Sequence, residues 1–556
     1  MFKPDFLLDL QSELAANIEA FLPEVILCAG IVLLLVLRLF GTFKRLHLGW
    51  VALGVSVAGL AVALGQWPPG AFGLQTPEDF VGDRVPLFTG LLVYDNFTIF
   101  LRIFLIFFAA LVIVLTLLTG IPDRDDSADF YCLLFGATLG MCIMASANHL
   151  LMVFIGIEMA SLPSYALAGF LKGRRQSSEA SLKYVVYGGG ASGVMLYGIS
   201  LLAGKFGTAS LPALATEYVN ALQPHADAAT IAVLTLGTLF LFIGIAFKLA
   251  AVPFHFWCPD VFEGASAEVA GFLSVASKGA ALALLGRVVF TFAGLDKSVH
   301  AAGELDVAKY LLPMLAIFAA VTATFGNLAA YLQTNLKRLL AYSTIAHAGY
   351  MMMGLATLTR AGAGAVLFYL VAYLFMNLGA FAVVAFLRNQ TGSEDLSSFR
   401  GLIRRSPVLT VTLAVFLLSL LGMPPLAGFA AKFQIFRVLY EGGQYYGTVG
   451  QPGLGWWLYA LLVIGGLNTV LSVVYYVKVM KVMILETTLE EVEGRPSPPL
   501  SAPGGSLLYA SLLAVVILMV GILWDPLARV SDVGVDRFNV SPPLKAVARA
   551  GTEVRP

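Results

Sequence analysis

The chain of 556 residues is 59% hydrophobic and only 12% charged, with a mean hydropathy of +0.85. A soluble globular domain averages about 25% charged residues, so this composition excludes a soluble protein of this size. Basic and acidic residues balance at 34 each, and we expect no nucleic-acid partner. Apolar runs of roughly 20 residues, each able to cross a ~30 Å hydrocarbon core, recur along the chain. The sequence therefore predicts an all-α polytopic protein embedded in a lipid bilayer.

The apolar runs predict about 14 membrane spans joined by short connections. No small-residue cleavage site follows the first run, so we interpret it as a span rather than as a signal peptide. Residues 68–94 are expected to hold a small surface hairpin, and a Pro/Gly/Ser-rich linker occupies 494–506. The predicted spans are 22–40, 48–66, 95–119, 129–147, 149–171, 181–204, 229–254, 269–293, 309–331, 338–358, 363–387, 407–440, 456–484 and 506–526.

Basic residues are distributed unevenly between alternate connections. With the N-terminus outside, the inner connections hold roughly three times as many lysines and arginines as the outer ones, which is the orientation that the positive-inside rule favours. Several basic residues in the C-terminal tail count against it. We predict that both termini face the periplasm or its equivalent. All six tryptophans fall at predicted span ends, where an indole ring prefers the headgroup level.

Three lysines, Lys248, Lys278 and Lys432, lie roughly two or more turns inside predicted spans. A lysine at the bilayer centre costs about 2.5 to 3.5 kcal/mol on insertion scales. Glu158 is the one carboxylate well inside an apolar run, so a single static ion pair would leave two lysines unexplained. The surplus amines need nearby water or a change of protonation state. This pattern favours proton transfer over purely structural pairing.

A proline interrupts the predicted span that carries Lys248. Pro253 lacks the N–H that would bond the carbonyl of Leu249. A carbonyl freed at membrane depth is tolerated only where protein or cavity water satisfies it. We therefore expect water beside Lys248, with a simple packing kink as the alternative. His255, seven residues after Lys248, is either a relay or gate residue or a hydrogen-bonded structural histidine.

Two prolines interrupt the span that carries Lys432 in the same way. Pro424 and Pro425 free the carbonyls of Leu420 and Leu421 a few residues before the lysine. A packing kink could explain either break alone, but both breaks accompany a lysine. The same chemistry is thus expected twice in the chain.

The two halves of the chain echo one another. "GIAFK" ends at Lys248 and "GFAAK" at Lys432, an offset of 432 − 248 = 184, and Glu158 and His347 are separated by 347 − 158 = 189. A unit of five spans would make the second copy inverted, an arrangement typical of transporters. We divide the chain into a three-span region (1–128), a first repeat with spans 4–8 (129–293), an inverted repeat with spans 9–13 (294–484) and a linker, last span and tail (485–556).

Titratable groups from both halves provide the components of a proton relay. The candidate residues are Glu158, Lys248, Lys278, His347 and Lys432, with His255 as a further candidate. The four cysteines lack the paired spacing of a zinc or iron–sulfur site, so we expect packing roles for them and neither a metal nor a redox cofactor in this chain.

Seven motifs occur in order between about residues 20 and 527: "LPEVIL", "IGIEMASLPSYALAGF", "GGASGVMLYGISLLAG", "KLAAVPFHFWCPDVFEGA", "ASKGAALALL", "LKRLLAYSTIAHAGYM" and "GMPPLAGFAAKFQIF". Together they resemble the antiporter-like membrane subunits of respiratory complex I, NADH:quinone oxidoreductase. Phe262 stands where the family often has tyrosine. The longest such subunit continues into a lateral helix that this chain lacks, and the middle one typically has glutamate where this chain has Lys432.

The resemblance implies a pair between Glu158 and Lys248, a central relay of Lys278 and His347, and Lys432 as the terminal proton-bearing residue. It also implies NADH, FMN, iron–sulfur clusters and quinone in partner subunits and no cofactor in this chain. The implied partners are other membrane subunits, including neighbouring antiporter-like subunits. We predict a non-redox, proton-translocating subunit of this enzyme, driven by quinone reduction in its partners. The alternatives are a subunit of a multi-subunit cation/proton antiporter and a structural subunit with static ion pairs.

Overall fold

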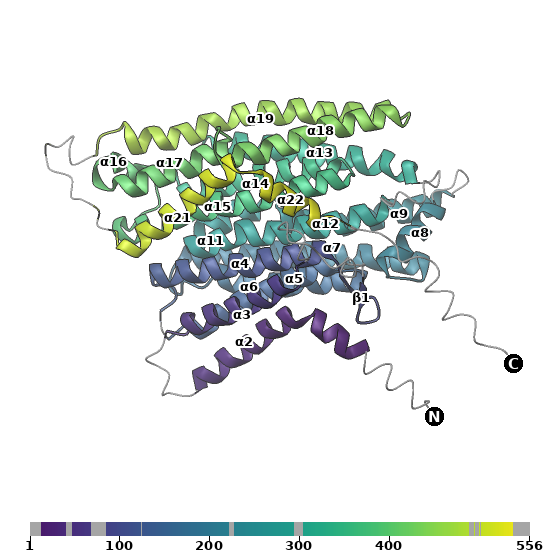
Figure 1. Cartoon of the computed structure of the whole chain (residues 1–556), viewed down its shortest axis with the longest axis horizontal. Helices are drawn as coiled ribbons and strands as arrows, with labels where there is room; N and C mark the ends of the chain where they lie inside the picture. Colours follow the sequence, from purple (N-terminus) through teal and green to yellow (C-terminus); the bar gives the residue numbers. More distant parts are fainter. Residues whose placement is uncertain are drawn as a thin grey trace.

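Long helices lying side by side make up nearly all of the fold (Figure 1). The computed structural model describes residues 13–39, 47–67, 85–123, 125–221, 227–293, 304–488, 494, 500 and 502–536. Eleven helices are long and apolar enough to cross a membrane, and α3, α14 and the pair α17–α18 bring the total to the 14 spans predicted. The polytopic helical fold is confirmed. The predicted periplasmic termini, and residues 495–499 and 501 of the predicted linker, lie outside the described residues.

The described part of the N-terminal region includes the helices α2, α3 and α4 and the predicted hairpin. Residues 85–94 form that hairpin, in which β1 pairs antiparallel with β2, while 68–84 lie outside the described residues. The next helix begins where the carboxylate of Asp95 accepts the N–H of Thr98 at 2.8 Å, as an N-cap does. The elements are α2 (Leu22–Leu39), α3 (Gly49–Gly65), β1 (Val85–Leu87), β2 (Leu92–Tyr94) and α4 (Asn96–Thr119).

The next five spans include the first interrupted helix. α9 ends at Leu249, Ala250 takes a left-handed conformation with φ 57°, and the chain resumes helical geometry at Trp257. The eighth span contains a π-helical turn, η3, which the sequence did not predict, and α8 is an unpredicted short helix in a connection. The elements are α5 (Ser127–Ser146), α6 (Leu150–Ala168), α7 (Arg175–Phe206), α8 (Leu211–Ala221), α9 (Ala228–Leu249), α10 (Trp257–Gly264), α11 (Ala267–Phe272), η3 (Leu273–Ser277) and α12 (Lys278–Phe292).

The remaining spans include the second interrupted helix. α17 ends at Leu421 and is capped by Gly422, whose φ of 95° suits glycine, and α18 begins at Ala427. The elements are α13 (Glu304–Ala330), α14 (Leu336–Ala356), α15 (Arg360–Thr391), η4 (Leu396–Phe399), α16 (Leu402–Arg405), α17 (Pro407–Leu421), α18 (Ala427–Thr448), α19 (Pro452–Ile484), α21 (Gly504–Ile522) and α22 (Asp525–Gly534).

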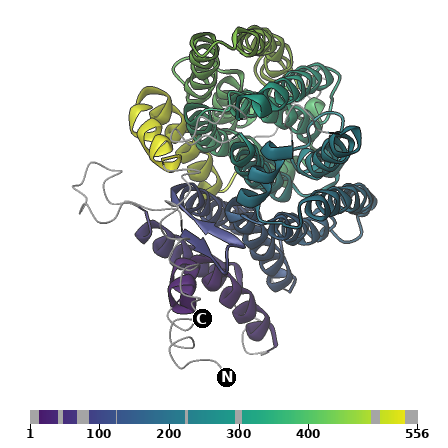
Figure 2. The ribbon, with the colours of Figure 1, turned by 90° about the vertical axis from the view of Figure 1, so that its right-hand side faces the viewer.

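The core lies where the two halves meet. In the span formed by α11, η3 and α12, every residue of the apolar stretch is buried, and in α15 the share of buried residues is 89%. In the apolar stretches of α2, α19 and α21 this share is only 28%. Viewed roughly along the helices, the purple N-terminal helices lie on one side of the bundle and the green helices of the second half on the opposite side (Figure 2). The buried central spans are therefore the ones least exposed to lipid.

Candidate functional site

Lys248 occupies the last turn of α9, immediately before the first break. Its side chain is 1% exposed, and its ammonium has no hydrogen-bond partner among the described residues. Two aromatic rings face the ammonium, Tyr165 at 5.9 Å and Tyr184 at 5.6 Å from Nζ to the ring centroid. The partial negative charge at the C-terminus of α9 also favours a cation there. In place of a direct hydrogen bond from the described residues, aromatic faces and a helix end surround this buried amine.

Glu158 projects from α6, and its carboxylate accepts a hydrogen bond from Ser192 on α7. The same helix α7 carries Tyr184, which faces Lys248. One helix thus contacts both members of the Glu158 and Lys248 pair that the family resemblance implies. A shift of α7 would change the surroundings of the acid and of the amine together.

Lys278 is the first residue of α12, directly after the π-helical turn. It is fully buried, and its ammonium lies 4.4 Å from the ring centroid of Trp257 and 4.0 Å from the sulfur of Cys258. The ring of Trp257 stacks on that of Tyr184 at 4.3 Å. Aromatic contacts therefore connect the surroundings of Lys248 with those of Lys278. Single π-helical turns are frequent at functional sites.

His347 lies on α14 between two tyrosine hydroxyls. Its Nδ1 is 2.7 Å from the hydroxyl of Tyr369 on α15, and its Nε2 is 3.2 Å from that of Tyr476 on α19. Tyr476 is in turn 2.5 Å from the hydroxyl of Ser343. Each of these groups can both donate and accept a hydrogen bond, so the cluster can pass a proton by exchanging roles.

Lys432 lies in the second turn of α18, just after the second break. Its ammonium donates a 2.8 Å hydrogen bond to the carbonyl of Leu421. This carbonyl is one of the two that Pro424 and Pro425 were predicted to free. The ammonium also lies 4.8 Å from the ring centroid of Tyr350, whose ring is 6.1 Å from that of His347. Lys432 thus satisfies the carbonyl at the break, and the ring of Tyr350 lies near both Lys432 and His347.

A glycine allows the two half-helices of the second break to meet. The N–H of Gly428 donates a 3.0 Å hydrogen bond to the hydroxyl of Ser419. A side chain on Gly428 would overlap the backbone carbonyl of Ser419. The glycine four residues before the first lysine, Gly244, is similarly tight against Met195. The repeated glycine therefore has a packing cause in both halves.

His255 lies within the first break, but its described contacts are on the side facing α13. Its ring packs against Phe256 at 4.4 Å and Phe325 at 4.5 Å, and its Nδ1 has no hydrogen-bond partner among the described residues. None of these contacts joins it to the other five candidates. The structure brings Lys278 close to α10, and His347 close to Lys432, through aromatic side chains.

A charged cluster at the end of α10 fixes this half-helix in place. Asp260 accepts hydrogen bonds from Lys183 on α7 at 2.6 Å and from Arg338 on α14 at 2.7 Å. Arg338 also pairs with Glu263 at 2.7 Å. Because α10 begins with Trp257, this cluster positions the aromatic surface beneath Lys278.

Deeply buried carboxylates lie near span ends, outside the apolar runs in which the sequence was searched for acids, whereas Glu158 itself is only partly buried. Each is paired with an arginine: Glu24 with Arg102 at 2.6 Å, Asp95 with Arg287 at 2.5 Å and Glu268 with Arg388 at 3.2 Å. Within the described residues, no carboxylate lies within ion-pair distance of Lys248, Lys278 or Lys432. Within the described residues these buried arginines are ion-paired with carboxylates, whereas Lys248, Lys278 and Lys432 are not.

Sequence reasoning missed most of the hydroxyl and aromatic groups around the candidates. The prediction that every tryptophan lies at headgroup level is wrong for Trp257, which is 1% exposed beside Lys278. Its position directly after a proline break, rather than at the end of a full span, was the available signal. Tyr350, three residues after His347, could have been found from helical spacing. Ser192, Tyr369 and Tyr476 come from other helices and gave no local signal.

The site can now be compared with known proteins. A family model described as "NADH:quinone oxidoreductase/Mrp antiporter, TM" matches residues 147–451, more than half of the chain. The chain belongs to this family. It is 39% identical to "NADH-quinone oxidoreductase subunit N" of Anaeromyxobacter sp. (strain Fw109-5), over 93% of this chain and 96% of that protein.

Two solved structures contain chains with a similar fold. A chain of respiratory complex I from Thermus thermophilus with bound aureothin is 29% identical, with a TM-score of 0.67 over 90% of this chain and 97% of that one. A chain of the Mrp complex from Dietzia sp. DQ12-45-1b is 20% identical, with a TM-score of 0.75 over 93% of this chain and 97% of that one. At that identity the second likeness shows the fold alone.

Proposed function

We propose that this chain is subunit N of a bacterial NADH:quinone oxidoreductase, a non-redox membrane subunit that moves protons. NADH, FMN, iron–sulfur clusters and quinone belong to partner subunits, and quinone reduction there supplies the driving energy. The 39% identity to a subunit N over nearly the whole chain supports this assignment over the cation/proton antiporter. Neighbouring antiporter-like subunits and the lipid bilayer are its partners, and both termini face the periplasm.

The observation that carries the proposal is a set of buried amines, near two matched helix breaks, that have no carboxylate within ion-pair distance among the described residues. The proposed relay runs from Glu158 and Lys248 through Lys278 and His347 to Lys432. Buried charges are normally paired, as the arginines are here. Amines that are not paired can release their protons at less cost, and this is the property that a relay needs.

The mechanism we infer is electrostatic. When Glu158 approaches Lys248, its negative charge stabilises the ammonium, and when Glu158 moves away or is neutralised, the proton leaves toward Lys278 and His347. Moving one charge against ~180 mV costs about 4 kcal/mol, and a change in one buried charge pair is of this size. His255 at the first break acts as a gate on the α13 side rather than as a link in the relay.

The domain division follows from the same elements. We propose 129–293 and 294–484 as inverted five-span repeats, flanked by the three-span region 1–128 and the segment 485–556. In both repeats the fourth span is the interrupted one, α9–α10 and α17–α18. In both, the buried lysine lies next to the break.

Purification through an affinity tag on this chain tests the assignment. We expect flavin, iron–sulfur clusters and NADH:quinone oxidoreductase activity to co-purify, with proton uptake into vesicles that is unchanged when sodium is omitted. Purification with membrane subunits alone, accompanied by sodium/proton exchange, would contradict the assignment and favour the antiporter.

A further inference from the structure

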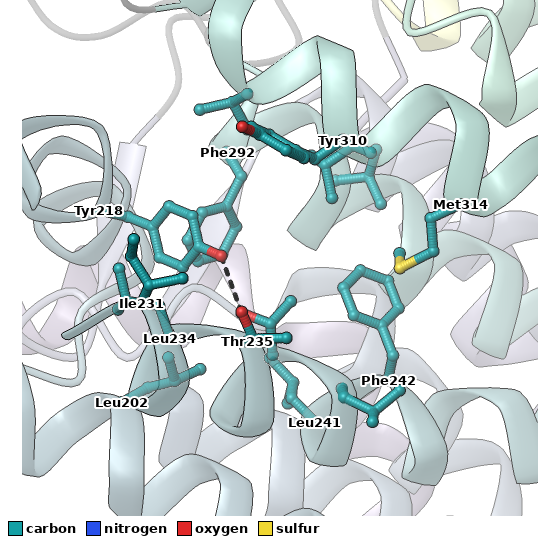
Figure 3. Close-up of a pocket in the computed structure, with 15 residues that line it drawn as sticks. Leu202, Tyr218, Ile231, Leu234, Thr235, Leu241, Phe242, Phe292, Tyr310 and Met314 are labelled. Atoms are coloured by element: carbon teal, nitrogen blue, oxygen red, sulfur yellow. Dashed lines mark hydrogen bonds between the residues drawn. The ribbon is translucent and has the colours of Figure 1, made fainter. Parts of the chain in front are cut away.

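A cavity of about 490 Å³ opens between the two halves of the protein, lined by none of the relay candidates. Side chains from α7, α8, α9, α12 and α13 line it. Figure 3 shows the open space, with Tyr218 and Leu202 on one side and Tyr310 and Met314 on the other. Its size is that of a ligand site rather than of a packing defect.

The walls of this cavity suit a hydrocarbon chain. None of the described side chains that line it is charged, and most are leucine, isoleucine, phenylalanine or methionine. The hydroxyls of Tyr218 and Thr238 lie 3.1 Å apart and satisfy one another. A polar or charged ligand would lose its hydration here and gain few hydrogen bonds in exchange, which is unfavourable. An alkyl chain has no such desolvation cost.

The cavity opens toward the lipid. Among the side chains that line the cavity, Ile231 and Leu239 on α9 are 47% and 41% exposed, and Tyr310 on α13 is 71% exposed. These helices are membrane spans, so the medium at the mouth is the acyl region of the bilayer. From Ile231 to Phe242 the lining extends over 12 residues of α9, a rise of ~17 Å, close to the ~15 Å depth of one leaflet.

A second, smaller cavity of about 40 Å³ extends the groove toward the break in the seventh span. It shares Phe242 and Met314 with the first cavity and reaches Ala251 and Phe254. At this end the N–H of Val252 donates to the hydroxyl of Thr322 on α13 at 3.1 Å, which joins the break to α13. The two cavities together form a groove along α9 and α13 that extends toward the break.

Charged side chains lie at the outer end of the groove. Lys205, at the end of α7, donates to the hydroxyl of Thr230 at 2.7 Å, next to the lining residue Ile231. Asp227 lies beside Lys205, and its pKa is lowered by a hydrogen bond with Thr230. Lys309 is exposed one residue before Tyr310. Positive and negative side chains therefore lie together at the expected level of the lipid headgroups. Lysine side chains there can attract the phosphate of a phospholipid.

We propose that this groove binds one acyl chain of a phospholipid from the outer leaflet, with the headgroup phosphate beside Lys205 and Lys309. The acyl chain fills the space between α9 and α13 and so completes the packing between the two halves. It also closes the lipid-facing side of the break that follows Lys248. The site is independent of the direction in which protons move.

Photo-crosslinking in the assembled, purified complex tests the site. The probe is a phospholipid with a diazirine at the end of one acyl chain, incorporated into phosphatidylethanolamine and phosphatidylglycerol vesicles. We expect peptides of α9 and α13 to be labelled at least about fivefold more than those of the exposed helix α19. Met314→Trp fills the groove and should reduce this labelling about fivefold, whereas Ile317→Trp, one turn away on the lipid face, should leave it unchanged.

A second matched pair covers the case in which Met314→Trp fails to assemble. Leu239→Trp narrows the groove from α9, and Leu236→Trp alters the neighbouring lipid face. Equal labelling of α9, α13 and α19, or equal labelling in groove and control variants, would overturn the proposal. So would displacement of the probe by an isoprenoid quinone but not by unlabelled phospholipid, or labelling of a neighbouring subunit in place of α9 and α13.

Discussion

The two interrupted spans hold their lysines differently. At the second break, the ammonium of Lys432 is fixed by a 2.8 Å hydrogen bond to the carbonyl of Leu421, which the proline break leaves free. At the first break, the ammonium of Lys248 contacts only aromatic rings and has no hydrogen-bond partner among the described residues. An ammonium that is not held by a hydrogen bond can move to a new partner without breaking one. We therefore regard Lys248 as the switch of the relay and Lys432 as its fixed end.

Removing the switch has the largest expected effect. Lys248→Met should lower the rate of proton translocation by about a hundredfold, the low end of what a positioned proton-transfer group contributes. Acidification of inverted membrane vesicles measures this rate. Lys172→Ala, at a lysine whose side chain is 74% exposed, is the control and should pump normally. Normal pumping by Lys248→Met with full assembly would reassign the lysine to a structural role.

Neutralising the acid that controls the switch should have the next largest effect. Glu158→Gln keeps the hydrogen bond with Ser192 possible but removes the charge, so we expect about tenfold slower pumping, equivalent to about 1.4 kcal/mol. Glu158→Asp retains the charge and should recover part of the rate. An equal rate in Glu158→Gln and the unmodified protein would show that the charge is not used.

Two variants separate the roles of Lys432. Lys432→Gln keeps a donor for the carbonyl of Leu421, and Lys432→Met leaves this buried carbonyl unsatisfied, at a cost of about 1 to 3 kcal/mol. We expect both to pump slowly, but only Lys432→Met to lower the thermal stability and the yield of the purified complex. If the two variants are equally stable, the hydrogen bond to Leu421 does not fix the second break.

The smallest effect is expected at the charged cluster that anchors α10. Asp260→Asn weakens the pairs with Lys183 and Arg338, which are about one-third exposed, so the loss should be about 1 kcal/mol or less. A fall of a few degrees in the melting temperature of the complex measures it. Glu179→Gln removes only an exposed partner of Lys183 and should change nothing.

The sequence predicted the spans and both breaks because apolar length and proline chemistry are local properties. The carbonyl of Leu421 was predicted to be free, and the structure shows which group satisfies it. The π-helical turn before Lys278 was not predictable, since "LSVAS" has no feature that separates it from an ordinary helix. The partners of Glu158 and His347 come from helices distant in the sequence, so only the fold could identify Ser192, Tyr369 and Tyr476.

The position of the Lys248 ammonium in the assembled complex tests the difference between switch and fixed end most directly. Electron cryomicroscopy at a resolution that shows ordered water would compare the resting enzyme with the enzyme turning over NADH. We predict that Lys248 lies within ion-pair distance of Glu158 in one state and beside ordered water in the other, while Lys432 keeps its hydrogen bond to Leu421. A Lys248 that stays dry and unpaired in both states would contradict the relay.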